Sequence, residues 1–99
     1  MRVTKEKQGE VLTVTIEGTL DISTAPQLKE EMEGELDDVM EVYFDMEKCD
    51  YTSSAGLRVL LGVYQVLDEK EGRMVLRNLN NSFMEILEMT GFTDFIEVE

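Results

Sequence analysis

The stretch that decides the fold joins a strand-like segment to an apolar helix through a turn rich in hydroxyl groups. The turn and the start of the helix read Asp50-Tyr51-Thr52-Ser53-Ser54-Ala55-Gly56-Leu57-Arg58-Val59-Leu60-Leu61. Residues 42–46 precede it as an apolar run typical of a buried strand, and the apolar residues that follow recur with a helical period. The pattern therefore predicts a serine at a helix N-terminus, where backbone N–H groups are free and the helix dipole favours an anion.

A serine at that position has two possible roles. It can cap the helix by accepting a hydrogen bond from a first-turn N–H, which is the common role. If it is phosphorylated, the new charge lies where a helix best tolerates an anion. The residues alone leave both roles open.

The motif Ser-Ser-Ala-Gly-Leu at residues 53–57, followed by an apolar helix, resembles the signature of bacterial anti-sigma factor antagonists, in the STAS domain family. In that family the serine two residues before the Gly-Leu pair is phosphorylated by a partner that is both anti-sigma factor and serine kinase. The matching residue is Ser54. Many members have Asp immediately before that serine, whereas this chain has Ser53, so Ser53 and Thr52 remain alternative acceptors.

The resemblance also covers residues 18–21, because members often carry Gly-x-Leu-Asp in a loop near the phosphorylation site. It implies a partner-binding surface that includes Asp21, Ser53, Ala55, Gly56 and Arg58. From the residues themselves, Asp21 is equally well suited to a turn before the next helix. Arg58 lies about one turn after the serine, where it can pair with a phosphate, with an acidic group of a partner, or in a surface salt bridge.

The composition limits the kinds of partner. The formal net charge is −13, from 9 basic and 22 acidic residues. We therefore expect no direct binding to nucleic acid or to anionic membranes, and we expect partners with a basic face. No apolar run approaches the roughly 20 residues that span a bilayer, and residues 1–6 lack the apolar core of a signal peptide, so we expect a cytoplasmic protein.

The sequence has few of the side chains that catalysis or metal binding usually requires. The chain has no histidine, and Cys49 is its only cysteine. We therefore expect no disulfide, metal or cofactor, and Cys49 is predicted to be a small, partly buried residue. An enzyme with Ser54 as nucleophile is the weaker alternative, because the motif is not Gly-x-Ser-x-Gly and no histidine can serve as base.

The rest of the chain predicts alternating strands and helices. Strands are expected at residues 3–7, 11–17, 41–46, 74–78 and 92–98, the first two joined as a hairpin at Gly9 and the third covered on both faces. Helices are expected from Ser23 or Thr24, from 54 to about 70, and from Ser82 to Gly91. Thr24 with Gln27, and Ser82 with Glu85, match the capping-box pattern.

The apolar residues of the long helix predict which side faces the core. The expected core stripe is Leu57, Leu60, Leu61, Tyr64 and Leu67. Val59, Val63 and Val66 lie off this stripe and should pack on a neighbouring helix or form a partner surface. Gly62 suggests close approach of another backbone. The seven methionines, Met89 among them, are interpreted as core fillers.

These elements predict an α/β fold: a single STAS-like domain over residues 1–99, with a small mixed sheet of four to five strands and helices largely on one side. The leading functional hypothesis is a binding module that, with Ser54 unphosphorylated, binds an anti-sigma factor serine kinase and releases a sigma factor. A serine phosphatase is a possible second partner. The alternative is an unphosphorylated STAS scaffold or a subunit of a larger signalling or transport complex.

Overall fold

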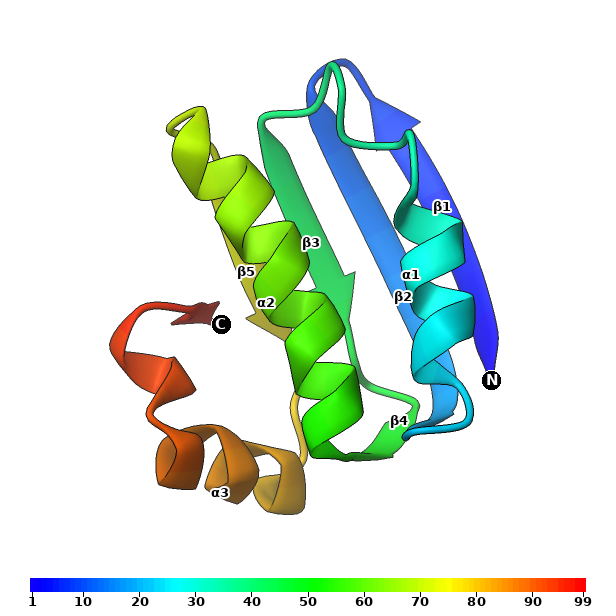
Figure 1. Cartoon of the computed structure of the whole chain (residues 1–99), viewed down its shortest axis with the longest axis vertical. Helices are drawn as coiled ribbons and strands as arrows, with labels where there is room; N and C mark the ends of the chain where they lie inside the picture. The colour runs from blue at the N-terminus through cyan, green and yellow to red at the C-terminus, as the bar shows by residue number, and fades with distance from the viewer.

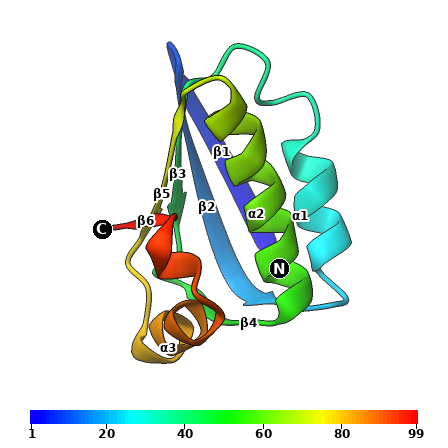
Figure 2. The same ribbon diagram turned by 60° about the vertical axis from the view of Figure 1, so that its left-hand side comes forward.

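The computed structural model describes residues 1–99 as a six-stranded sheet with α1 and α2 side by side on one face (Figures 1 and 2). The strands of the main path, in spatial order, are β1 (Arg2–Gln8), β2 (Val11–Leu20), β3 (Glu41–Asp45), β5 (Arg73–Arg77) and β6 (Glu97–Val98). Only the opening hairpin of β1 and β2 is antiparallel, and every other pairing is parallel. The helices are α1 (Ala25–Met32), α2 (Ser54–Glu69) and α3 (Asn81–Thr90). None of them is both long enough and apolar enough to cross a bilayer.

The sheet has one strand more than the sequence predicts. Strand β4 (Cys49–Thr52) pairs in parallel with the end of β2, which runs on to Leu20 instead of ending at residue 17. The register shifts after Gly18, whose φ of +108° is a conformation that favours glycine. The shift lies within the β2–β4 pairing, because Gly18 pairs with Cys49 and Thr19 with Tyr51; β2 has already left β3 after Thr15. At the other end of the chain, the predicted strand over 92–98 is reduced to β6, because η1 (Phe92–Asp94) is a 3₁₀ helix.

The core lies between the sheet and the helices. Along β2 and β3 the side chains alternate between fully buried and half-buried, as expected when helices cover one face only. The largest fully buried side chains include Leu12, Ile16, Leu20, Leu28, Phe44, Leu60, Leu67, Leu76, Phe83 and Leu87. The predicted stripe of α2 is confirmed for Leu57, Leu60 and Leu67, but Val63 is also buried.

The second face of the central strand β3 is not covered by a helix, so that prediction was wrong. Tyr43 is half-buried there beneath two guanidinium groups. The Arg77 group lies 4.0 Å and the Arg73 group 5.8 Å from the ring centroid. Cation–π contacts and the arginine stems therefore cover this aromatic ring in place of a second helical layer.

Two predicted capping boxes do not form. The side chain of Thr24 makes no cap hydrogen bond to α1. Before α3 the cap is Asn80, whose side-chain oxygen accepts from the Phe83 N–H at 2.8 Å, while Ser82 is exposed inside the first turn. The free N–H groups of α1 thus have no side-chain cap, and those of α3 are capped by the residue directly before the helix.

Of two predictions about α3, the one for its end is confirmed and the one for a core methionine is wrong. Gly91 ends α3 with φ of +78°, as predicted. Met89 is 85% exposed, so its assignment to the core was wrong, whereas Met32, Met46 and Met74 are buried.

Candidate functional site at the start of α2

Three consecutive hydroxyl side chains occupy the turn from β4 into α2, and the fold separates them. Thr52 is fully buried, and its hydroxyl donates to the Ser53 carbonyl at 3.2 Å. The Ser53 hydroxyl oxygen is buried and has no hydrogen-bond partner. Ser54, the first residue of α2, is exposed. Of the three candidate acceptors, only Ser54 presents its side chain to the surface.

Ser53 fixes the turn through its backbone. Its N–H donates to the Leu20 carbonyl at 3.0 Å, which ties the helix start to the end of β2. Its carbonyl accepts the first helical hydrogen bond, from the Leu57 N–H at 3.1 Å. No side chain caps the helix, so the N–H groups of its first turn remain available to an anion.

Gly56 lies underneath this turn and is buried. A Cβ atom at this position would lie 2.4 Å from the Thr52 hydroxyl, 2.6 Å from Cγ of Leu20 and 2.9 Å from the Leu20 carbonyl oxygen. The first turn of α2 can therefore approach the end of β2 only because residue 56 has no side chain. The structure places Gly56 where it shapes the site from below, not on the outer surface.

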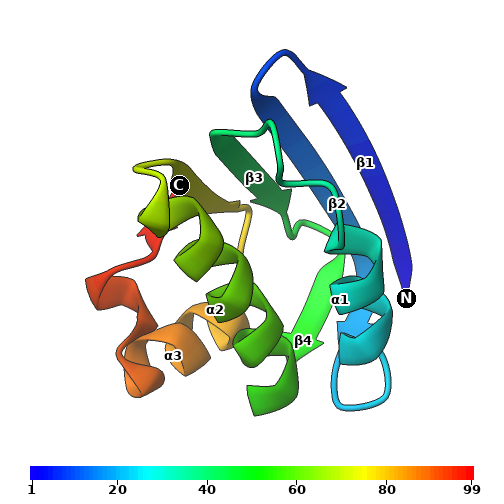
Figure 3. The same ribbon diagram turned by 45° about the horizontal axis from the view of Figure 1, so that its top comes forward.

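The loop between β2 and α1 reaches the same end of the molecule as the start of α2, with β4 between them (Figure 3). Its conformation is held by Asp21, whose carboxylate accepts hydrogen bonds from the Ser23 hydroxyl at 2.7 Å, the Ser23 N–H at 2.9 Å and the Thr24 N–H at 3.2 Å. The bonds from Ser23 hold the pKa of Asp21 below its ordinary value. Asp21 therefore stabilises the turn before α1, one of the two roles that the sequence left open. It follows Leu20, whose carbonyl accepts the hydrogen bond from the Ser53 N–H.

Residues that the sequence analysis did not single out hold β4 in place. The Thr19 hydroxyl donates to the Asp50 carboxylate at 2.8 Å, and the Asn80 side-chain amide donates to the Asp50 carbonyl at 3.0 Å. These bonds connect the turn to β2 and to α3. Cys49, in the same strand, is buried rather than partly buried, and this burial raises the pKa of its thiol.

Arg58 and Ala55 line a groove of about 770 Å³ between α1 and α2. Arg58 is exposed, and it makes none of the ion pairs of the structure, so the surface salt bridge proposed for it does not form. The groove is lined by Ile22, Ala25, Pro26, Lys29, Met32, Glu33, Leu36, Ala55, Arg58, Val59, Gly62, Val63, Gln65 and Val66. Of the three valines outside the predicted core stripe, Val63 is buried in the core, Val59 is half-buried and Val66 is 44% exposed, so only part of the surplus packs against the rest of the chain.

The comparison with known proteins agrees with this architecture. The chain belongs to the STAS domain family, whose model matches residues 2–99. It is 33% identical over 99 residues to BtrV of Bordetella bronchiseptica, provisionally named an anti-sigma factor antagonist; the match covers 99% of this chain and 85% of BtrV. It is 28% identical over 96 residues to the anti-sigma-B factor antagonist of Listeria monocytogenes, covering 96% and 84% of the two chains.

Among solved structures, the fold is similar to the anti-sigma factor antagonist SpoIIAA in its unphosphorylated form. The TM-score is 0.80 at 18% identity, covering 99% of this chain and 87% of SpoIIAA. Phosphorylated SpoIIAA from Bacillus gives a TM-score of 0.78 at 18% identity, with 99% and 91% covered. At this identity the likeness establishes the fold alone.

Proposed function

We propose that this protein is an anti-sigma factor antagonist whose binding to an anti-sigma factor is controlled by phosphorylation of Ser54. With Ser54 unphosphorylated, it binds the anti-sigma factor and a sigma factor is released. The observation that carries the proposal is the selective exposure of Ser54 at the start of α2, while the neighbouring hydroxyl oxygens are buried. The names of the curated relatives support the same class of function.

In the proposed modification this chain is the substrate. A partner serine kinase transfers the γ-phosphoryl group of ATP to the Ser54 hydroxyl oxygen. The new O–P bond forms as the bond to the ADP leaving group breaks, and the hydroxyl proton passes to a base of the kinase. A serine phosphatase would reverse the step by hydrolysis. All of these reactions would take place in the cytoplasm, where the sigma factor acts.

The phosphate would act by repulsion at the docking surface. It adds roughly −1.5 to −2 charges to a chain that already carries −13. The uncapped first turn of α2 can accommodate this charge, so the fold need not change. The similar TM-scores to both forms of SpoIIAA, 0.80 and 0.78, are consistent with one fold in either state. A like-charge contact costs several kcal/mol, and about 2.8 kcal/mol weakens binding a hundredfold.

The first test is intact mass with site mapping on the protein purified from its own cells, during growth and after stress. We expect one phosphate on Ser54, with an occupancy that differs between the two conditions. A Ser53→Ala variant should still be modified, whereas Ser54→Ala should not. A phosphate that maps to Ser53 or Thr52 would refute the assignment, and an unmodified protein in both conditions would favour the scaffold alternative.

The second test measures binding of the anti-sigma factor by calorimetry. Ser54→Ala should bind before and after treatment with kinase and ATP, and Ser54→Asp should bind at least about tenfold more weakly than the parent. Ser82→Asp is the matched control, because it places the same charge on an exposed serine in the first turn of α3. If both Ser54 variants bind like the parent under all conditions, the switch does not exist.

A further inference from the structure

The groove between α1 and α2 is long enough to hold a helical segment. Its α2 wall is made by a stripe at helical spacing, including Ala55, Val59, Gly62 and Val66. From Ala55 to Val66 this stripe spans three turns, or about 16 Å at 1.5 Å per residue. The opposite wall is α1 with the loop before it, which contributes Ile22. A trough of this length between two helices fits an amphipathic helix better than a small, enclosed ligand.

The groove keeps apolar surface in contact with solvent. Ile22 is 79% exposed and Val66 is 44% exposed. At Gly62 an added Cβ atom would meet nothing within 4 Å, so this glycine does not serve close approach by another part of the chain, contrary to the sequence interpretation. A glycine inside a helix costs about 1 kcal/mol relative to alanine. Because residue 62 has no side chain, this part of the α2 wall leaves the groove open.

The charges around the groove differ from those of the whole chain. Six of the nine basic side chains form ion pairs, and a seventh, Lys70, donates to the Leu36 carbonyl. The two that remain without any such partner are Lys29 and Arg58, one on each wall of the groove. Glu33 is the only acidic residue that lines it.

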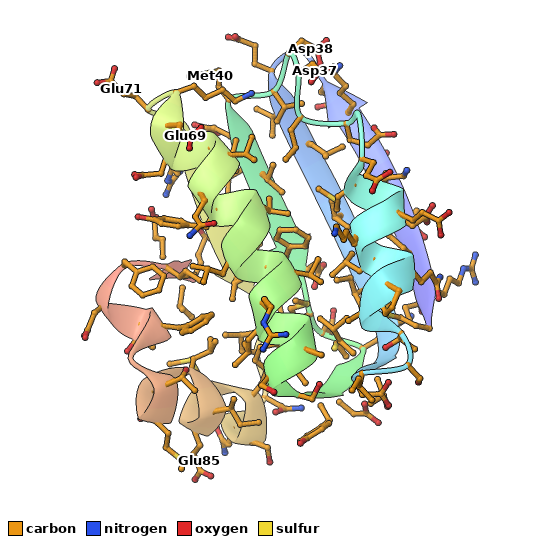
Figure 4. All side chains as sticks on the ribbon, viewed as in Figure 1. Asp37, Asp38, Met40, Glu69, Glu71 and Glu85 are labelled. Carbon is orange, nitrogen blue, oxygen red and sulfur yellow. The ribbon has the colours of Figure 1, made fainter.

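Four of the 22 acidic residues lie far from the start of α2. Asp37, Asp38, Glu69 and Glu71 gather at the end of the molecule where α2 terminates (Figure 4), far from its first turn. Two basic residues and one acidic residue thus line the groove, a local excess of positive charge on a chain whose net charge is −13.

We infer that the α1–α2 groove is the docking site for an amphipathic, acidic helical segment of the partner protein. Its apolar side chains would lie on Val59, Gly62 and Val66, and its carboxylates would pair with Lys29 and Arg58. The inference rests on the proposed function for the identity of the partner, the anti-sigma factor. The chemical preference of the groove is a property of this chain and can be measured without that partner.

The same geometry explains how phosphorylation would regulate the groove. Ala55, which follows Ser54 directly, lines the groove, and Arg58 lies four residues after Ser54, on the same side of α2. A phosphate on Ser54 would compete with the partner's carboxylate for the Arg58 guanidinium. It would also repel the acidic segment as a whole.

The test is an NMR titration of the isotope-labelled full chain with two synthetic amphipathic peptides. Both carry the same leucine stripe, flanked by glutamates in one peptide and by lysines in the other. We expect the glutamate peptide to shift the resonances of Ile22, Val59 and Val66, and the lysine peptide to leave them unchanged. The net charge alone would favour the lysine peptide, so tighter binding of that peptide in the groove would overturn the inference.

Charge-reversal variants test which side chains give the groove its preference for the glutamate peptide. Arg58→Glu and Lys29→Glu should each weaken the glutamate peptide at least about tenfold. Arg2→Glu and Lys48→Glu are the matched controls, with the same charge change on exposed side chains outside the groove, and should stay within about twofold of the parent. Equal effects in both pairs would mean that only net charge matters, and the inference would fail.

A neutral variant tests the shape of the groove. Gly62→Leu replaces a helix-destabilising residue, so it should fold, but its side chain would project from the α2 wall into the groove and abolish peptide binding. Gly62→Ala should leave binding intact. If Gly62→Leu binds the peptide like the parent, the segment does not lie in the groove. Sedimentation tests the other occupant: a dimer of the parent that Gly62→Leu abolishes would overturn the inference, because a second copy of the chain would then fill the groove.

The two proposals fail separately. Selective binding of the glutamate peptide by a chain that is never phosphorylated would refute the switch and leave the groove assignment intact. Phosphorylation of Ser54 with no response of the groove to the glutamate peptide would leave the switch intact and refute the groove assignment.

Discussion

Replacing Gly56 with alanine should destabilise the protein, although alanine is the better helix former. The added methyl group would lie within 3.0 Å of three atoms, on Thr52 and Leu20, and one of these is a backbone oxygen that cannot rotate away. Overpacking a close contact costs about 1–3 kcal/mol, and three simultaneous contacts place this site at the upper end. The gain in helix propensity is about 1 kcal/mol. The expected net loss is about 2 kcal/mol.

The assay is thermal and urea unfolding followed by circular dichroism. A loss of about 2 kcal/mol lowers Tm by roughly 8–16 °C in a domain of this size. The matched control is Gly62→Ala, the same substitution in the same helix, where the methyl group meets nothing within 4 Å. It should raise the stability by about 1 kcal/mol. If Gly56→Ala raises Tm as Gly62→Ala is expected to do, the close packing of α2 on the end of β2 is refuted.

Three further predictions concern the helix starts and the buried thiol. Asn80→Ala should lower the free energy of unfolding by about 1 kcal/mol, whereas Ser82→Ala should change it by less than about 0.5 kcal/mol in the same urea titration. Because the pKa of Asp21 is lowered in the folded state, its hydrogen bonds stabilise the protein above the unfolded-state pKa of about 3.9, and this advantage is lost as the pH falls through the folded-state value. Unfolding of parent and Asp21→Ala should therefore converge at acidic pH; a gap that stays constant would contradict this. Cys49 should react with iodoacetamide only on unfolding, and rapid labelling of the native protein would contradict its burial.

The elements that sequence predicts best are those with a long, regular pattern. Helix α2 follows from the recurrence of leucines and valines, and the hairpin follows from alternating β-branched residues on either side of Gly9. Strand β4 has only four residues and no alternation, and its burial pattern shows both ends inside and the middle outside. It exists because β2 continues past Thr15, where its pairing with β3 ends, and pairs with β4 from Gly18 on, which is a tertiary event that local sequence does not encode.

The candidate site likewise has some features that the sequence predicts and others that depend on the folded structure. The family resemblance selects Ser54 among three adjacent hydroxyl residues, but which of them is exposed depends on how the turn folds against Leu20. The groove depends on the placement of α1, because Lys29 is separated from Arg58 by a strand, a loop and β4. The excess of valines on α2 was the one available signal, and it could not distinguish packing on a helix from an open surface.

The wrong predictions for Gly62, expected to meet another backbone, and for Gly56, expected on the partner-binding surface, have one physical origin. Both glycines lie in α2, and helical periodicity cannot say which of them meets another backbone. In the structure Gly56 is closed in by β2 and β4, so the first turn is held rigidly and Ser54 projects outward. Gly62 faces the groove with no neighbour. The same helix therefore uses one glycine to fix the position of the proposed phosphorylation site, and the other to keep open the surface that the phosphate would control.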